Sequence, residues 1–128
     1  MCGRFALIIS QAELEKIFGL RLDEEFNPRY NIAPSQTVPV ITFQEKDKKK
    51  KMSSMKWGLV PSWAKDPSIG DRMINARSET IHEKPSFRSA FQRRRALIPA
   101  SGFFEWKREG NTKIPYFIGM KEMKTFAF

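Results

Sequence analysis

Apolar and polar residues alternate along this chain in short blocks, which predict many strands and few helices. Residues 1–9 are mostly apolar and predict a strand. Ser10 and Glu13 then form a capping box that begins a helix, and Gly19 ends it. The expected apolar face of this helix consists of Leu14, Ile17 and Phe18.

The rest of the chain predicts hairpins joined by irregular segments. Residues 37–43 and 52–59 form two expected strands around a charged turn at residues 44–50. A short buried, strand-like piece is expected at residues 74–77, and a helix at residues 86–93. Further strands are expected at residues 96–99, 102–106, 114–118 and 125–128. A turn at residues 109–111 is expected between the second and third of these strands. With no internal repeat or linker, residues 1–128 predict a single domain.

Composition narrows the class of protein. A chain of 128 residues is long enough for one small domain, and 41% apolar residues suffice for a buried core. The longest uncharged apolar runs fall far short of the roughly 18 residues that a membrane helix needs, and the N-terminus lacks a signal-peptide pattern. The single cysteine excludes an internal disulfide. We therefore expect a soluble cytoplasmic protein with no membrane partner, no metal and no cofactor.

The charge of the chain favours an anionic partner. The formal net charge is +9 and the pI about 9.9, and nucleic acid is the commonest partner of such proteins. A basic surface that only confers solubility is the alternative. The lysines at residues 48–51 are interpreted as a solvated hairpin tip rather than as a specific binding site.

Cys2 has the most distinctive chemistry. Initiator methionine is removed when the next side chain is small, and its removal here would leave Cys2 with an amine and a thiol on adjacent carbons. Their reference pKa values are about 8 and about 8.5, so both are partly reactive at neutral pH. The amine can form a Schiff base with an aldehyde, and the thiol can then close a thiazolidine ring. Alternatively, Cys2 is a small hydrophobic residue without a chemical role.

Three polar residues are further candidates. Glu105 lies among aromatic residues in an expected strand, where burial would raise its pKa toward a useful acid–base range. An outward-facing charge is the alternative. Asn75 and Arg77 are expected on one face of a strand-like piece, where they suit a sugar oxygen and a phosphate, or else form a buried pair.

Aromatic and basic residues near these positions complete the candidate set. Trp57 and Trp63 flank a proline-containing loop and could stack on bases of a single strand, or belong to the core. Arg4 lies two residues from Cys2, near any chemistry at the terminus. His82, the only histidine, is expected in an exposed turn or helix with a structural role.

Five motifs occur in order along the chain. They are MCGRF at residues 1–5, YNIAP at 30–34, WGLVP at 57–61, NARSET at 75–80 and GFFEW at 102–106. Together they resemble the SOS-response-associated peptidase (SRAP) family, the abasic-site processing proteins, over essentially the whole chain. Each motif alone is weak, whereas five in order, with cysteine directly after methionine, are specific.

The resemblance implies an α+β fold with a mainly antiparallel, barrel-like sheet and a few short helices. It also implies a DNA-damage-response protein that crosslinks to abasic sites in single-stranded DNA through a thiazolidine at Cys2, after removal of Met1. At the matching positions, Asn75 would position the sugar and the Cys2 amine, and Glu105 would assist ring opening and proton transfer. DNA contacts are implied at Arg4, Pro34, Trp57, Trp63 and Arg77. The protein would associate with the nucleoid when bound to DNA.

One departure from the family concerns length. Family members continue into a segment with a His-Asp-Arg-Met-Pro-type motif, whose histidine belongs to the active site and is not matched here. The pattern stops within an expected strand at residues 126–128, so we expect the N-terminal portion of a longer domain. An exposed sheet edge and association between copies would follow, whereas the full-length protein would be a monomer.

Two other functions stay open beside a crosslinking protein with weak lyase-like activity. Cys2 could be the nucleophile of a thiol peptidase that cleaves its own Met1–Cys2 bond, with Glu105 in the activating group. The chain could also be a non-covalent single-stranded DNA-binding module that uses its basic charge and aromatic residues.

Overall fold

The computed structural model describes residues 2–23 and 25–128 and has a mixed α+β architecture. Its elements in chain order are β1 (Phe5–Leu7), α1 (Gln11–Phe18), β2 (Arg29–Ile32), β3 (Thr37–Gln44), β4 (Lys49–Lys56), η1 (Pro67–Arg72), α2 (Pro85–Arg93), β5 (Pro99–Ala100), β6 (Gly102–Glu109), β7 (Thr112–Gly119), η2 (Lys121–Met123) and β8 (Phe126–Ala127). Within this described part, no helix combines the length and apolar character that crossing a bilayer requires.

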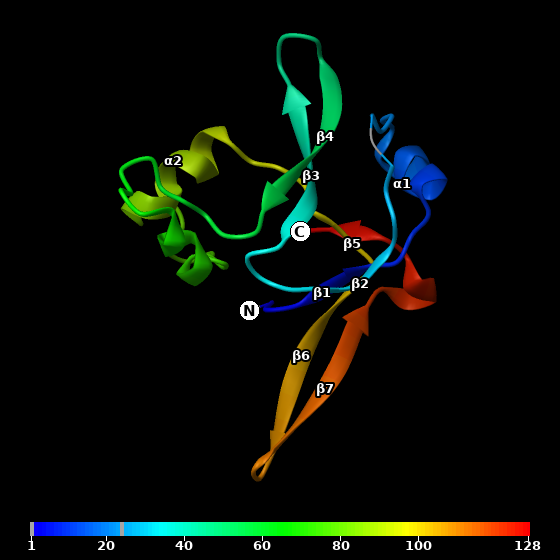
Figure 1. Cartoon of the computed structure of the whole chain (residues 1–128), viewed down its shortest axis with the longest axis vertical. Helices are drawn as coiled ribbons and strands as arrows, with labels where there is room; N and C mark the ends of the chain where they lie inside the picture. The colour runs from blue at the N-terminus through cyan, green and yellow to red at the C-terminus, as the bar shows by residue number, and fades with distance from the viewer. Residues whose placement is uncertain (1, 24) are drawn as a thin grey trace.

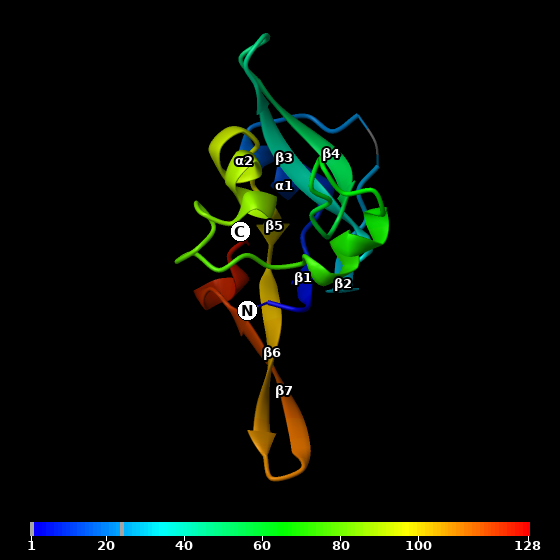
Figure 2. The ribbon, with the colours of Figure 1, turned by 90° about the vertical axis from the view of Figure 1, so that its left-hand side faces the viewer.

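Antiparallel pairing organises the strands into three separate sheets. The largest has the order β2-β1-β6-β7, and β3–β4 and β5–β8 form two more. Figures 1 and 2 show the β3–β4 and β6–β7 hairpins projecting from opposite ends of the body. An isolated bridge between Ile41 and Leu97 connects β3 to the segment before β5. The expected antiparallel α+β fold is confirmed, although the sheets do not close into a barrel.

The core lies around β1, because this strand is covered on both edges and both faces. All three β1 residues are buried, between β2 on one edge and β6 on the other. Side chains from α1 and from β2, β3 and β5 complete the cluster. Its buried members are Phe5, Leu7, Ile9, Leu14, Ile32, Val38, Val40 and Ala100. The strand that begins three residues after Cys2 therefore lies in the buried core.

Local sequence signals predict the first helix correctly. Ser10 and Glu13 form both hydrogen bonds of the capping box, and Gly19 ends α1 in the left-handed conformation. Leu14 is fully buried, whereas Ile17 is 53% exposed. The apolar face is therefore confirmed in part, and it is narrower than expected. The predicted second helix is also confirmed as α2.

The strand predictions are confirmed in kind and corrected in extent. The return strand β4 ends at Lys56, because the chain turns away at Gly58, where φ is 138°. The strand expected at residues 74–77 is absent from the structure. At residues 96–99, the regular strand is limited to the start of β5, preceded by the Leu97 bridge and by two backbone hydrogen bonds between Ile98 and Phe128. The hairpin β6–β7 is longer than predicted, with the turn where it was expected.

Residues 57–75 form a loop that closes on itself, and this closure replaces the expected strand. The indole N–H of Trp57 donates to the carbonyl of Ile74 at 2.8 Å. The backbone N–H of Leu59 donates to the carbonyl of Met73 at 3.0 Å. Because the Ile74 carbonyl accepts from a side chain, this segment runs beside the loop rather than in a sheet.

Strand β7 forms an exposed edge of the four-stranded sheet. Its neighbour β6 lies on one side only, and the hairpin carries partly exposed large apolar side chains. They are Trp106, Tyr116, Phe117 and Ile118. An edge of this kind can pair with another chain. Association between copies stays a prediction.

Glycine at residue 58 is required by the loop closure, which predicts a large cost for Gly58→Ala. An added Cβ would lie 2.3 Å from the carbonyl oxygen of Gly70, at a φ that disfavours side chains. We expect a loss of about 3 kcal/mol or more in the free energy of unfolding, measured by denaturant titration. Gly110→Ala is the matched control, because that site also has positive φ but open space around the Cβ. It should cost only about 1–2 kcal/mol, and equal losses would contradict the close approach.

Candidate functional site

Cys2 lies just before β1 and is held by contacts on both sides of its backbone. Its carbonyl accepts a hydrogen bond of 2.7 Å from the Asn75 side-chain amide. Its thiol contacts the Arg4 carbonyl at 3.4 Å. The half-buried side chain packs against the core cluster. These contacts fix the start of the chain to the body of the protein.

Asn75 reaches Cys2 because the closed loop carries it there. It follows directly after Ile74, the acceptor of the Trp57 indole, and its side chain is half-buried. The two residues are 73 positions apart in the sequence. The pairing of Asn75 with Cys2 therefore depends on tertiary structure and not on local sequence.

Strand β6 brings Glu105 near Cys2. This strand pairs with β1 in the register Phe5 opposite Phe103, and the Phe104 N–H donates to the Arg4 carbonyl at 2.8 Å. Glu105 is half-buried, and its negative charge acts on the Cys2 thiol. The structure thus brings together the three residues that the sequence nominates for chemistry.

The pKa of the Cys2 thiol is raised above its ordinary value. Burial is the main cause, a hydrogen bond with the Arg4 backbone acts in the opposite direction, and the Glu105 charge raises the pKa further. Both raising effects disfavour the thiolate. The thiol therefore keeps its proton at neutral pH more strongly than a free cysteine does.

The two arginines nominated for phosphate contacts have different settings. Arg4 donates to the side-chain oxygen of Asn31 at 3.1 Å, and its buried Nε has no hydrogen-bond partner among the described residues. Arg77 is exposed in the chain just after Asn75. The expected common face of Asn75 and Arg77 is not seen as a strand face, because this segment is irregular. Asn31 belongs to the YNIAP motif but not to the candidate residues, and its contact with Arg4 depends on tertiary structure.

The two tryptophans are not equivalent. Trp57 is half-buried, and its ring packs edge-on against Phe5 with centroids 5.4 Å apart. Trp63 lies in a turn and is 59% exposed. Pro34 is half-buried beside Ser35, whose N–H donates to the Trp57 carbonyl at 3.1 Å. Trp57 is therefore anchored to the core, and Trp63 offers a free aromatic face.

His82 lies outside this cluster of contacts. It is exposed in a turn, and its Nε2 lies 3.3 Å from a carboxylate oxygen of Glu83. Across residues 2–23 and 25–128, no group of three or more His, Cys, Asp or Glu side chains could hold a metal ion.

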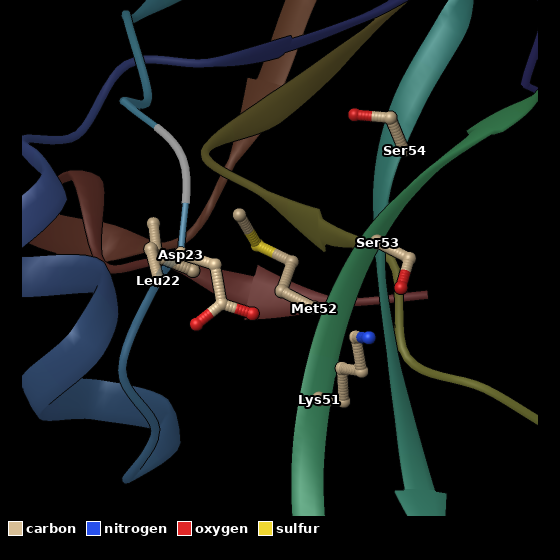
Figure 3. Close-up of a pocket in the computed structure, with 6 residues that line it drawn as sticks. All are labelled: Leu22, Asp23, Lys51, Met52, Ser53 and Ser54. Carbon is tan, nitrogen blue, oxygen red and sulfur yellow. The ribbon is translucent and has the colours of Figure 1, made fainter.

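A pocket lies away from Cys2. Figure 3 shows it between β4 and the segment after α1, with the oppositely charged Asp23 and Lys51 among the residues that line it. Its volume is about 290 Å³. Met52 in its wall packs against the core. The full lining consists of Leu22, Asp23, Lys51, Met52, Ser53 and Ser54, so it shares no residue with the site.

Comparisons with known proteins identify relatives of the chain. The family model described as "SOS response associated peptidase (SRAP)" matches residues 1–128. Abasic site processing protein YoqW of Bacillus subtilis is 44% identical over 135 residues, covering 100% of this chain and 58% of that protein. Abasic site processing protein YedK of Escherichia coli is 36% identical over 126 residues, covering 92% of this chain and 53% of that protein.

Solved structures share the fold. A protein from Bacteroides thetaiotaomicron superposes with a TM-score of 0.84 at 28% identity, covering 98% of this chain and 57% of that one. A phage-related protein from Bordetella bronchiseptica gives a TM-score of 0.76 at 30% identity, covering 99% of this chain and 58% of that one. The chain thus spans somewhat more than half the length of the relatives that it matches.

The position of Glu105 predicts a pH effect on Cys2. Glu105→Gln removes a negative charge that raises the thiol pKa, so more thiolate should form at a given pH. The midpoint of iodoacetamide alkylation against pH should move to lower pH than in the unchanged protein. Glu109→Gln is the matched control, because Glu109 lies on the same strand at the hairpin tip, paired with Lys107. It should leave the midpoint unchanged, and equal shifts in both variants would contradict the proximity of Glu105 and Cys2.

Proposed function

We propose, from the premise that the chain belongs to the SOS response associated peptidase (SRAP) family, that it senses abasic sites in single-stranded DNA and crosslinks to them through Cys2. The names of its relatives refer to abasic sites. An abasic sugar in its ring-opened form carries an aldehyde, which is the electrophile that an N-terminal cysteine can capture. Removal of Met1 would expose the required amine.

The first step joins the Cys2 amine to the aldehyde carbon of the sugar. The nitrogen adds to the carbonyl, and the resulting hydroxyl leaves as water to give a Schiff base. Glu105 would accept the proton that the amine releases and return it to the departing hydroxyl. Asn75 would hold the Cys2 backbone in place through its hydrogen bond to the carbonyl.

The second step closes the ring within the same residue. The thiol sulfur bonds to the imine carbon, and the thiol proton passes to the nitrogen, so that no further reagent is consumed. Sulfur attacks as the thiolate, so the raised pKa of Cys2 lowers the fraction of the thiol that is ready to react at neutral pH. Intramolecular ring closure is favoured by its high effective molarity.

The observation that carries the proposal is the hydrogen bond between Asn75 and Cys2. The long loop closes and delivers the Asn75 amide to the carbonyl of Cys2, which places a polar side chain beside the residue proposed to react. Around this pair, Arg4 and Arg77 would contact phosphates, and Trp63 and Pro34 would contact the strand. Trp57 would act mainly through the loop that it anchors.

A thiol peptidase has less support from the same geometry. A nucleophilic thiolate needs a lowered pKa or an adjacent base, whereas burial and Glu105 raise the pKa of Cys2. The only histidine pairs with Glu83. Cleavage of the Met1–Cys2 bond by the protein itself would still be compatible with crosslinking.

Two variants separate the two nucleophiles of Cys2. Cys2→Ala keeps an amine but lacks the thiol, so it should give no heat-stable adduct with an abasic single strand and yet be trapped by borohydride. A chain extended before Met1, so that the Cys2 amine stays acylated, should give neither adduct. Intact mass measures both outcomes. A heat-stable adduct of the extended chain would overturn the thiazolidine, and a simple thiol nucleophile would then explain it.

Non-covalent DNA binding has its own prediction at Arg77. If Arg77 contacts one phosphate, Arg77→Ala should weaken binding of all sequences about equally and reduce the slope of log K against log salt by about 0.7. Titration of a labelled single strand at several salt concentrations measures the slope. Arg108→Ala, in β6 near the tip of the distant hairpin, is the control and should leave the slope unchanged. A loss confined to particular base sequences would contradict a phosphate contact.

A further inference from the structure

Asn31 lies in strand β2, and its side chain holds the guanidinium group of Arg4. The Nη1 group of Arg4 donates to the Asn31 side-chain oxygen at 3.1 Å. Strand β2 pairs with β1 on the side away from β6, so this contact ties the segment that carries Cys2 to a second strand. We propose that Asn31 and Arg4 together bind one phosphate of the DNA strand, with Asn31 both positioning Arg4 and donating to the phosphate itself. This inference rests on the proposed function and adds Asn31 to the residues named there.

The chemistry of the pair fixes the orientation of the Asn31 amide. A guanidinium group has N–H donors and no acceptor, so the amide oxygen, and not the amide nitrogen, must face Arg4. The Nδ2 group of Asn31 then points away from this hydrogen bond. It has no partner within residues 2–23 and 25–128, and Asn31 is exposed. Its two N–H donors are therefore open to an anionic oxygen.

The guanidinium group of Arg4 is held in place before any strand binds. Its Nη1 is engaged by Asn31, and its Nε is buried. Among the described residues, its Nη2 has no hydrogen-bond partner and no carboxylate forms an ion pair with Arg4. Because the long side chain is already ordered, less conformational entropy is lost on binding. A fixed cation beside amide donors suits a phosphate, which has several acceptor oxygens.

The pair lies beside the residue proposed to react. The Arg4 carbonyl contacts the Cys2 thiol at 3.4 Å and accepts a hydrogen bond of 2.8 Å from the Phe104 N–H. Any strand that reacts at Cys2 must therefore reach the short segment that carries Arg4. We expect the bound phosphate to be one of those next to the abasic sugar.

The test measures non-covalent binding to a labelled single strand that contains tetrahydrofuran, an abasic analogue without an aldehyde. Such a strand cannot form a Schiff base, so the result is independent of Cys2 chemistry. Asn31→Ala should lower the affinity about tenfold, the effect of one hydrogen bond to a charged group. Asn31→Asp should lower it further, because a carboxylate still accepts from Arg4 but repels a phosphate. Asn111→Asp is the matched control, with the same change of charge in the distant β6–β7 turn (Figure 1), and should cost less than about twofold.

Strands with one neutral methylphosphonate show whether these losses act through a phosphate. The neutral group is placed at each linkage near the tetrahydrofuran in turn. At one linkage, Asn31→Ala and Arg4→Ala should each lower the affinity by less than about twofold, because the charge that both residues bind is absent there. A contact that only stabilises the fold would weaken binding to every strand by the same factor.

Two results would overturn the inference. One is a loss of affinity in Asn31→Asp no larger than that in Asn111→Asp. The other is a loss in Asn31→Ala that is the same at every methylphosphonate position. If the shared phosphate is found but strands with a true abasic site form no crosslink, the phosphate site stands and the covalent function fails.

Discussion

The indole N–H of Trp57 donates to the carbonyl of Ile74, and the position of Asn75 follows from this contact. The loop between them has no sheet to hold its end, so one side-chain hydrogen bond, one backbone hydrogen bond and the close approach of Gly58 to Gly70 close it. The closed loop delivers Asn75 to Cys2. The ring of Trp57 also packs against Phe5, which couples the loop to the core.

Elements coded by local signals could be predicted from the sequence. The capping box and final glycine predict α1, and alternation with turn residues predicts the two long hairpins, because these structures are stabilised by near neighbours. Residues 74–77 could not be predicted in the same way. Their apolar and polar alternation resembles a strand, but their backbone is engaged by Trp57 and Leu59. The sequence also did not predict that the sheets stay open instead of closing into a barrel, because this depends on contacts between distant segments.

The candidate site shows the same division. The residue types and the order of the motifs nominate Cys2, Asn75 and Glu105, which three separate segments bring together. The sequence does not say that Trp57 is anchored while Trp63 is exposed, since both share one motif region. Nor does it indicate the contact between Arg4 and Asn31, because these residues come from separate segments and meet only in the folded chain. Residue types indicate which side chains could react, whereas the positions of these side chains depend on the tertiary structure.

The partners of β1 also bear on the order of events during synthesis. Strand β6 pairs with β1, and Ile8, just after β1, donates to the side chain of Ser101, 93 residues later. While the chain leaves the ribosome, β2 becomes available to β1 early, whereas β6 and Ser101 follow only when most of this region has emerged. An enzyme acting on the nascent N-terminus before residue 75 emerges would meet a Cys2 carbonyl without the Asn75 hydrogen bond of the finished protein. Maturation of the terminus and assembly of the site would thus be separated in time by the length of the intervening chain.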